Sequence, residues 1–201
     1  MTISIDQIKQ LREETGAGIL DCRKALEQAN GDFQAALEFL REKGLATAVK
    51  RADREATEGR IELYSHGDGR VGVMVEVNCE TDFVARSEAF RHFAHEVALQ
   101  IAAASPRYIR DEDIPAEILE KEVEAARALA REEGKPEAVV ERIIAGRLAK
   151  FKDENTLLRQ AYIRDDGITV EKLLLQNIAS IGENIVIRRF QRWELGEQSD
   201  E

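Results

Sequence analysis

Three residues near the middle of the chain have the types that could bind a metal ion. His92, His95 and Glu96 would lie on one side of a helix, because they fall within little more than one helical turn. Their order is HxxHE, whereas the order that binds zinc in metalloproteases is HExxH. The histidines also flank the apolar positions Phe90 and Phe93, a pattern typical of a partly exposed helix flank. A metal-dependent hydrolase using these residues is one alternative that the sequence leaves open.

A glycine-rich stretch matches a phosphate-binding fingerprint letter by letter. Residues 67–72 read GDGRVG, which fits GxGxxG. In a dinucleotide site these glycines follow a strand and open a helix, whose N-terminus receives the pyrophosphate. Here strand-like alternation follows, and Asp68-Gly69 between two such runs is a strong hairpin signal. The pattern favours a turn between two strands.

The residues after a predicted buried strand are the strongest candidates for a site. Valines at every second position of residues 71–77 predict a strand with one buried face. Just beyond its end, Asp82 places a carboxylate beside the aromatic Phe83. Phe83 lies seven residues before Phe90, so a helix extended backwards would bury it in the core. Thr81, however, favours turns and helix starts, which would leave Phe83 presented at a tip.

Composition restricts the classes of partner. The chain has 201 residues, of which 43% are hydrophobic and 34% charged, values typical of a soluble globular protein. A net charge of −10 argues against direct nucleic-acid binding and favours protein partners. No secretory signal and no apolar run of about 18 residues is visible, so we expect a cytoplasmic protein without membrane contact. Cys22 and Cys79 lack metal-binding spacing and are expected to be thiols; no cofactor is expected.

Residues 1–54 are expected to form a helical head followed by a linker. Ser4, with a glutamine three residues later, is a capping-box signature for a first helix. Gly16 can end that helix in the left-handed conformation, and a second helix follows from about residue 19. Asp32 can cap a third helix, whose apolar stripe is expected to end at Gly44. About forty residues bury little surface alone, so this head is a marginal module.

Residues 55–201 are expected to form an α+β core, an antiparallel sheet with packed helices. Strands are predicted at 60–64 and 71–77, and Ser87 can cap a long helix that ends before Pro106. Later elements are a strand near 157–163, a turn at 165–167, a helix after Thr169 that ends at Gly182, and a strand over 183–195.

An arm is expected to project from this core over residues 116–152. Two charged segments, separated by Gly134-Lys135-Pro136, each carry apolar residues at a spacing of three to four. Narrow stripes of this kind favour an antiparallel helical hairpin, or coiled coil, inserted into the core.

Four stretches, taken together and in this order, resemble the family of bacterial and organellar translation elongation factor Ts. They are LREETGAGILDCRKAL (11–26), VNCETDFVAR (77–86), EGKPEAVVERIIAGRLAKF (133–151) and IGENIVIRRF (181–190). The resemblance covers nearly the whole chain. It implies that the head is similar to a ubiquitin-associated domain and that the arm is a coiled coil.

The resemblance also implies a function. Members of this family eject GDP from elongation factor Tu, which implies here an exchange factor that acts by binding and is not an enzyme. The family's TDFV motif matches Thr81, Asp82, Phe83 and Val84, which would act as a wedge that disturbs the Mg²⁺ and phosphate site of the GTPase. Further partner contacts are implied for two other groups of positions. These are Arg12, Ile19, Leu20 and Lys24 in the head, and Ile181 and Gly182 in the IGEN stretch.

Two further interpretations stay open. Ile19 and Leu20 could instead pack in the core of the head. A helical adaptor, whose head binds peptides or ubiquitin-like partners, is an alternative to exchange.

The oligomeric state is a separate question. Longer relatives carry two versions of the core subdomain and this chain has one, so a symmetric homodimer could supply the second half. The strand over 183–195, with Phe190 and Trp193, is the candidate contact.

Overall fold

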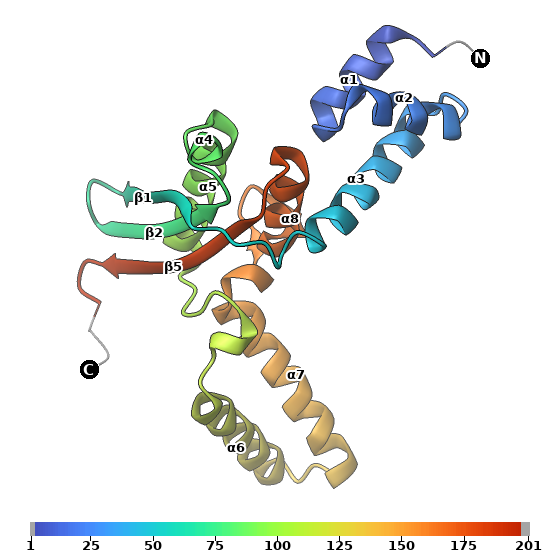
Figure 1. The fold of residues 1–201 in the computed structure, drawn as a ribbon. Helices are drawn as coiled ribbons and strands as arrows, with labels where there is room; N and C mark the ends of the chain where they lie inside the picture. Colours follow the sequence, from blue (N-terminus) through green and yellow to red (C-terminus); the bar gives the residue numbers. More distant parts are fainter. Residues whose placement is uncertain (1–2, 198–201) are drawn as a thin grey trace. The chain divides into compact units, whose positions relative to one another are not determined.

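The computed structural model describes residues 3–197, apart from the side chains of residues 137 and 138. It contains helices and a three-stranded sheet in the order β1-β2-β5, which confirms the α+β class (Figure 1). In chain order the elements are α1 (Ile5–Thr15), α2 (Ile19–Gln28), α3 (Phe33–Val49), β1 (Glu58–His66), β2 (Val71–Cys79), α4 (Asp82–Ala85), α5 (Glu88–Ala104), η1 (Asp111–Asp113), α6 (Ala116–Glu132), α7 (Glu137–Asn155), η2 (Leu157–Arg159), β3 (Ala161–Tyr162), β4 (Asp165–Thr169), α8 (Val170–Ile181) and β5 (Ile185–Glu194).

The chain forms two compact units that alternate along the sequence. One consists of Met1–Glu62, Val75–Glu96 and Lys172–Arg188, and the other of Leu63–Met74, Val97–Glu171 and Arg189–Glu201. The residues implied for partner binding by the resemblance all belong to the first unit, whereas Phe190 and Trp193, the candidate dimer contacts, belong to the second.

The three predicted head helices are present. Ser4 and Gln7 form the predicted capping box at the start of α1, and Gly16 ends that helix with a φ of 67°. The Asp32 side chain accepts a hydrogen bond from the Ala35 amide at the start of α3. The helices share a buried cluster made of Leu11, Cys22, Ala25, Leu26, Ala36, Leu37 and Leu40.

The apolar stripe of α3 was expected to end at Gly44, but the helix continues to Val49, and Ala48 beyond the glycine is buried. A Cβ atom added at Gly44 would lie 3.1 Å from the Cβ atom of Ala179 on α8. The glycine therefore allows α3 to approach α8 closely, and its cost of about 1 kcal/mol inside a helix is tolerated.

The predicted hairpin between β1 and β2 is confirmed. The Arg70 amide donates to the His66 carbonyl at 3.0 Å, and Asp68 and Gly69 have φ values of 55° and 87°. Positive φ at both positions is what a tight hairpin turn needs. The glycine-rich stretch is thus a turn that leads into a strand and does not open a helix.

The predicted apolar faces of β2 and α5 are both buried. Val73, Val75 and Val77 alternate with more exposed residues along β2. Ser87 caps the start of α5, since its Oγ accepts from the Phe90 amide at 3.3 Å. The buried side of α5 contains Phe90 and Phe93, which the sequence marked as apolar positions, and also Ala94, Val97, Ala98 and Ile101.

Helices α6 and α7 lie side by side as a hairpin (Figure 1). Gly134, with a φ of 66°, lies in the turn between them. Ala126, Ala130, Val140 and Ile144 form the buried seam. Glu122 and Arg147 pair across the helices at 3.1 Å, which supports the same alignment.

The strand predicted near 157–163 is present only at residues 161–162, and the turn predicted at 165–167 is wrong. Residues 157–159 form a short 3₁₀ helix, β3 covers only Ala161–Tyr162, and residues 165–167 begin β4. The turn lies at residues 163–164. The cause is tertiary, because the amides of Leu157 and Leu158 donate to the carbonyls of Tyr108 and Ile109 at 2.8 and 3.1 Å. Apolar alternation does not carry that information.

Candidate partner-binding site

The end of β2 turns directly into a single helical turn. Thr81 is the N-cap of α4, and its hydroxyl accepts from the Val84 amide at 3.3 Å. The sequence had indicated that Thr81 favours a turn or a helix start, and here it starts a four-residue helix. A helix this short is unstable by itself and needs support from its surroundings.

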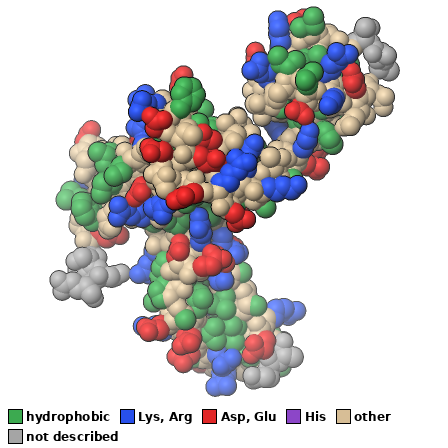
Figure 2. Space-filling model, in the orientation of Figure 1, with side chains coloured by type: hydrophobic (Ala, Val, Ile, Leu, Met, Phe, Trp, Pro, Cys, Tyr) green, Lys and Arg blue, Asp and Glu red, His purple; other side chains and the backbone are tan. Residues whose placement is uncertain are grey.

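Phe83 points outward from this turn. Its exposed fraction is 81%, whereas the next residue, Val84, is only 9% exposed. In Figure 2 hydrophobic atoms stand at the outer end of the α4 region, among basic and acidic side chains. The core interpretation of Phe83, suggested by its spacing from Phe90, is therefore wrong.

The IGEN stretch lies beside the same tip. Gly182 ends α8 with a φ of 90°, and its amide donates to the Ile178 carbonyl at 3.0 Å. The next residue, Glu183, accepts hydrogen bonds from the amides of Glu80 and Thr81 at 3.1 and 3.0 Å. The hydrogen bonds of Glu183 thus bring the IGEN stretch, with Ile181 and Gly182, to the segment that begins at Thr81.

Two residues of this arrangement were not identified as site residues from the sequence. They are Glu183 and Asn184, which connect the IGEN stretch to the β2 tip. The sequence shows only that Glu183 and Asn184 are polar and lie between a glycine that ends a helix and an apolar strand. Nothing in that pattern says which distant segment they contact.

A polar cleft of about 350 Å³ runs along one side of α4. Its basic residues are Arg60, Arg86 and Arg91, and its acidic residues are Glu58 and Asp82. Arg86 and Asp82 pair with each other at 2.8 Å, so part of this charge is balanced within the tip. Figure 2 shows the same mixture of charges around the tip, which suits a protein surface better than a polyphosphate.

Cys79 lies at the base of the tip as a buried thiol. Its Sγ donates to the Thr81 carbonyl at 3.2 Å. Burial, followed by the nearby charge of Glu183, raises the pKa of the Cys79 thiol to about 11. The neutral thiol is inert as a nucleophile and serves here as a small packed side chain with one weak hydrogen bond.

The four candidate residues of the head are all on its surface. Ile19 and Leu20 are 56% and 71% exposed, so the interpretation that they pack in the core is wrong. Arg12 and Lys24 are exposed as well. Exposed aliphatic residues beside basic ones form a surface suited to another protein.

The candidate metal residues do not form a cluster. Glu96 is buried, while His92 and His95 are exposed. His95 Nδ1 lies 3.3 Å from Glu62 Oε1. Among residues 3–197, no group of three or more histidine, cysteine and carboxylate side chains could hold a metal ion. Within the same range, no helix is long and apolar enough to cross a membrane.

Comparison with known proteins gives a consistent result. The model of the family described as Elongation factor TS matches residues 23–197. The elongation factor Ts of Caldanaerobacter subterraneus subsp. tengcongensis is 60% identical over 195 residues, which are 97% of this chain and 98% of that protein. The elongation factor Ts of Moorella thermoacetica is 56% identical over 202 residues, covering 99% and 100% of the two chains. That of Geobacter sulfurreducens is 52% identical over 197 residues, covering 98% and 91%. The chain belongs to the elongation factor Ts family.

Proposed function

We propose that this protein is a guanine-nucleotide exchange factor that binds elongation factor Tu and promotes the release of GDP. It acts in the cytoplasm during translation elongation, by binding and not by covalent catalysis. The observation that carries the proposal is Phe83, an aromatic side chain 81% exposed at the end of a supported turn. Membership of the elongation factor Ts family supports the choice of partner.

The energetic requirement for such a factor is modest. It must bind the nucleotide-free GTPase more tightly than the GDP-bound form, and GDP then weakens its binding by the same factor. Each tenfold loss of GDP affinity requires about 1.4 kcal/mol of differential binding. Complete burial of one exposed phenylalanine contributes about 1.5–3 kcal/mol, so Phe83 alone can supply a tenfold effect or more.

The other residues of the motif have different parts in this proposal. Asp82 and Phe83 are the exposed members that enter the GTPase and disturb its Mg²⁺ and phosphate site. Val84 is buried and anchors the turn, and Thr81 caps it. The motif therefore acts as one rigid unit, with two residues presented and two that hold them.

Further contacts come from the head and from the end of α8. In the head, Ile19 and Leu20 supply apolar area, and Arg12 and Lys24 supply charge around it. Ile181 and Gly182 lie next to the motif because Glu183 holds the two segments together. These contacts would hold the factor on its partner while Phe83 inserts.

We also propose how the head, the core and the arm divide the chain. Residues 1–54 are a head of the ubiquitin-associated type with its linker, and 55–201 are the core. The hairpin over 116–152 is a coiled-coil arm inserted into that core, which is supported by its buried seam of small and branched residues.

We also propose that the protein forms a symmetric homodimer through the outer face of its sheet. In the second unit Leu63, Met74 and Trp193 are exposed and line an apolar hollow of about 360 Å³. A two-fold interface needs one self-complementary patch, and a protruding tryptophan beside an apolar hollow provides it. The second copy would also supply the core subdomain that longer relatives carry twice.

The test of exchange is release of a fluorescent GDP analogue from elongation factor Tu, followed by stopped flow. Substoichiometric protein should accelerate release through many turnovers. Added GDP should in turn weaken the complex between the two proteins. Stable binding without accelerated release would reject exchange, and retained binding by residues 1–54 alone would then favour the adaptor alternative.

A further inference from the structure

The segment that carries Phe83 is hydrogen-bonded at its start to one carboxylate, which lies 102 residues further along the sequence than Thr81. Glu183 uses both of its oxygens on the β2 tip. Oε2 accepts from the amides of Glu80 and Thr81 at 3.1 and 3.0 Å. Oε1 accepts from the Thr81 hydroxyl at 2.7 Å. Three hydrogen bonds to a charged group are a strong local restraint.

A reciprocal bond closes the arrangement. The Asn184 amide donates to Glu80 Oε1 at 2.6 Å, so each segment provides a carboxylate to the other. We call the four residues Glu80, Thr81, Glu183 and Asn184 the tip clasp.

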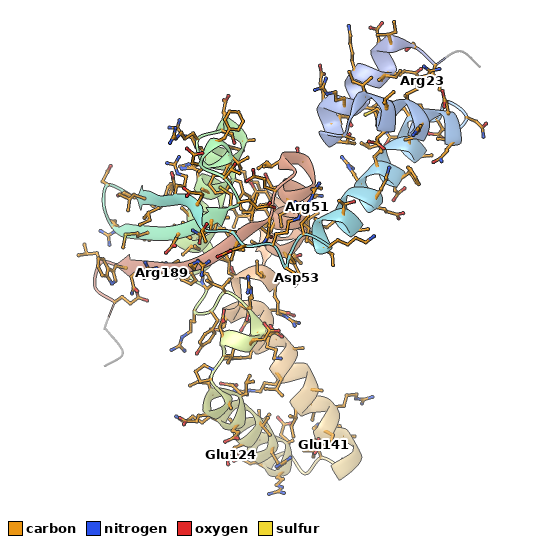
Figure 3. All side chains as sticks on the ribbon, in the orientation of Figure 1. Arg23, Arg51, Asp53, Glu124, Glu141 and Arg189 are labelled. Atoms are coloured by element: carbon orange, nitrogen blue, oxygen red, sulfur yellow. The ribbon has the colours of Figure 1, made fainter. Side chains whose placement is uncertain are left out.

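The base of the tip clasp is fixed to the linker between α3 and β1. Asn184 is 2% exposed, and its side-chain amide donates to the carbonyls of Ala52 and Arg54 at 3.2 and 2.7 Å. In the same linker, where Figure 3 labels Arg51 and Asp53, Arg51 donates to the Ile178 carbonyl at 3.2 Å. The anchoring partners are therefore backbone groups, which move less than side chains.

The tip clasp continues into α4 through Thr81. Its hydroxyl donates to Glu183 and also accepts from the Val84 amide at 3.3 Å. A single hydroxyl thus joins the carboxylate to the first turn of the helix that carries Phe83. Without this restraint, a four-residue helix has little intrinsic stability and samples many conformations.

We propose that Glu183 is a positioning residue for exchange, which holds the segment from Thr81 to Val84 in the geometry needed for Phe83 to enter the GTPase. This inference rests on the proposed exchange function. A pre-ordered wedge does not lose conformational entropy when it inserts, so the restraint acts on the rate of GDP release. Partner affinity changes less, because the head contacts do not involve Glu183.

The test combines two measurements on the full chain. In the free protein, Glu183→Ala should speed amide hydrogen exchange at Glu80 and Thr81 by at least about tenfold, since their shared acceptor is gone. In stopped flow with elongation factor Tu, the same variant should lower the maximal rate of GDP release by about tenfold. The concentration of factor that gives half the maximal rate should change less than about threefold.

Two further variants distinguish a loss of positioning in Glu183→Ala from a general effect on folding. Glu183→Gln keeps an oxygen for the backbone amides and loses the charge, so it should restore part of both effects. Asp113→Ala is the matched control, because Asp113 Oδ2 also accepts a backbone amide, that of Arg110 at 2.9 Å, but lies in the other unit. It should leave GDP release unchanged.

The outcomes are distinct. Faster amide exchange with an unchanged maximal release rate in both Glu183 variants would overturn the positioning role. An effect on half-saturation alone would also overturn it, because Glu183 would then act as a partner contact. If the unaltered protein did not release GDP at all, the proposed function would fail instead, whatever the amide exchange of the variants showed.

Discussion

Among the residues that the structure describes, two aromatic side chains are highly exposed, and their surroundings differ. Phe83 is 81% exposed and stands on a turn held by charged hydrogen bonds. Trp193 is 72% exposed and lies on a sheet strand, beside the exposed Leu63 and Met74. The first is an isolated apolar group on a polar support, and the second is part of a continuous apolar patch.

The difference indicates two kinds of contact. A single aromatic side chain on a rigid support can enter a pocket of a partner and leave it again. Only a small apolar area is exposed to water when the complex dissociates. An apolar patch on a sheet face is costly to expose and suits a lasting interface. We therefore propose that the tip carries out exchange and that the sheet face carries self-association.

The largest expected effect is on self-association. Trp193→Asp places a charge in the centre of the apolar patch and should weaken the homodimer by at least about a hundredfold, the loss of about 2.7 kcal/mol typical of an interface hot spot. Sedimentation of both proteins at several concentrations would measure it.

The same variant tests whether the two regions act independently. Its rate of GDP release per chain should equal that of the unaltered protein. If the monomeric Trp193→Asp variant no longer releases GDP, the tip needs the dimer. The two regions would then not act independently. An unaltered protein that is already monomeric at micromolar concentration would remove the homodimer.

A smaller effect is expected from the head. Changing both Ile19 and Leu20 to serine should weaken the complex with elongation factor Tu by about tenfold, because two exposed aliphatic side chains lose their burial on binding. Titration calorimetry would measure the affinity. Since neither side chain is buried in the free protein, the melting temperature should stay within about 2 °C. An unchanged affinity would remove both residues from the interface.

A few-fold effect is expected at the cap of α4. Thr81→Val removes the hydroxyl and should slow GDP release by about fivefold, the equivalent of the roughly 1 kcal/mol that an N-cap contributes. Thr81→Ser retains the hydroxyl and is the matched control, with a rate near that of the unaltered protein. Equal rates in both variants would show that the cap does not support the wedge.

A separate effect, on stability and not on exchange, is expected at high pH. The pKa of Cys79 is raised to about 11 from its ordinary value of 9.0, so the folded protein favours the neutral thiol. The resulting stabilisation is complete below pH 9 and is lost as the pH rises to about 11. Urea unfolding at pH 8.5 and 10.5 should show a larger loss of stability in the unaltered protein than in Cys79→Ala. Equal losses would contradict the raised pKa.

Local chemistry explains which parts of the fold the sequence could predict. The capping box at Ser4 and the turn at Asp68-Gly69 each depend on a few neighbouring residues, and both are confirmed. Gly44 shows the limit of local signals. It resembles a helix end, but the close approach of Ala179, far away in the chain, explains it.

The candidate site shows the same limit. The resemblance located Thr81–Val84, but periodicity alone left Phe83 between core and surface. The tip clasp could not be predicted, because Glu183 and Thr81 are joined by hydrogen bonds between segments far apart in the sequence. Only the folded chain shows which carboxylate is bonded to the segment that carries Phe83.

The most direct test of this account is the maximal rate of GDP release from elongation factor Tu, measured by stopped flow with Phe83→Ala. We expect a loss of at least about tenfold, equivalent to 1.4 kcal/mol, with the melting temperature unchanged because the side chain is exposed. Phe39→Ala, at a partly exposed aromatic on α3, is the matched control and should retain the full rate. A Phe83→Ala variant as fast as the unaltered protein would contradict the wedge, and the source of exchange would then have to lie in Ile181, Gly182 or the head.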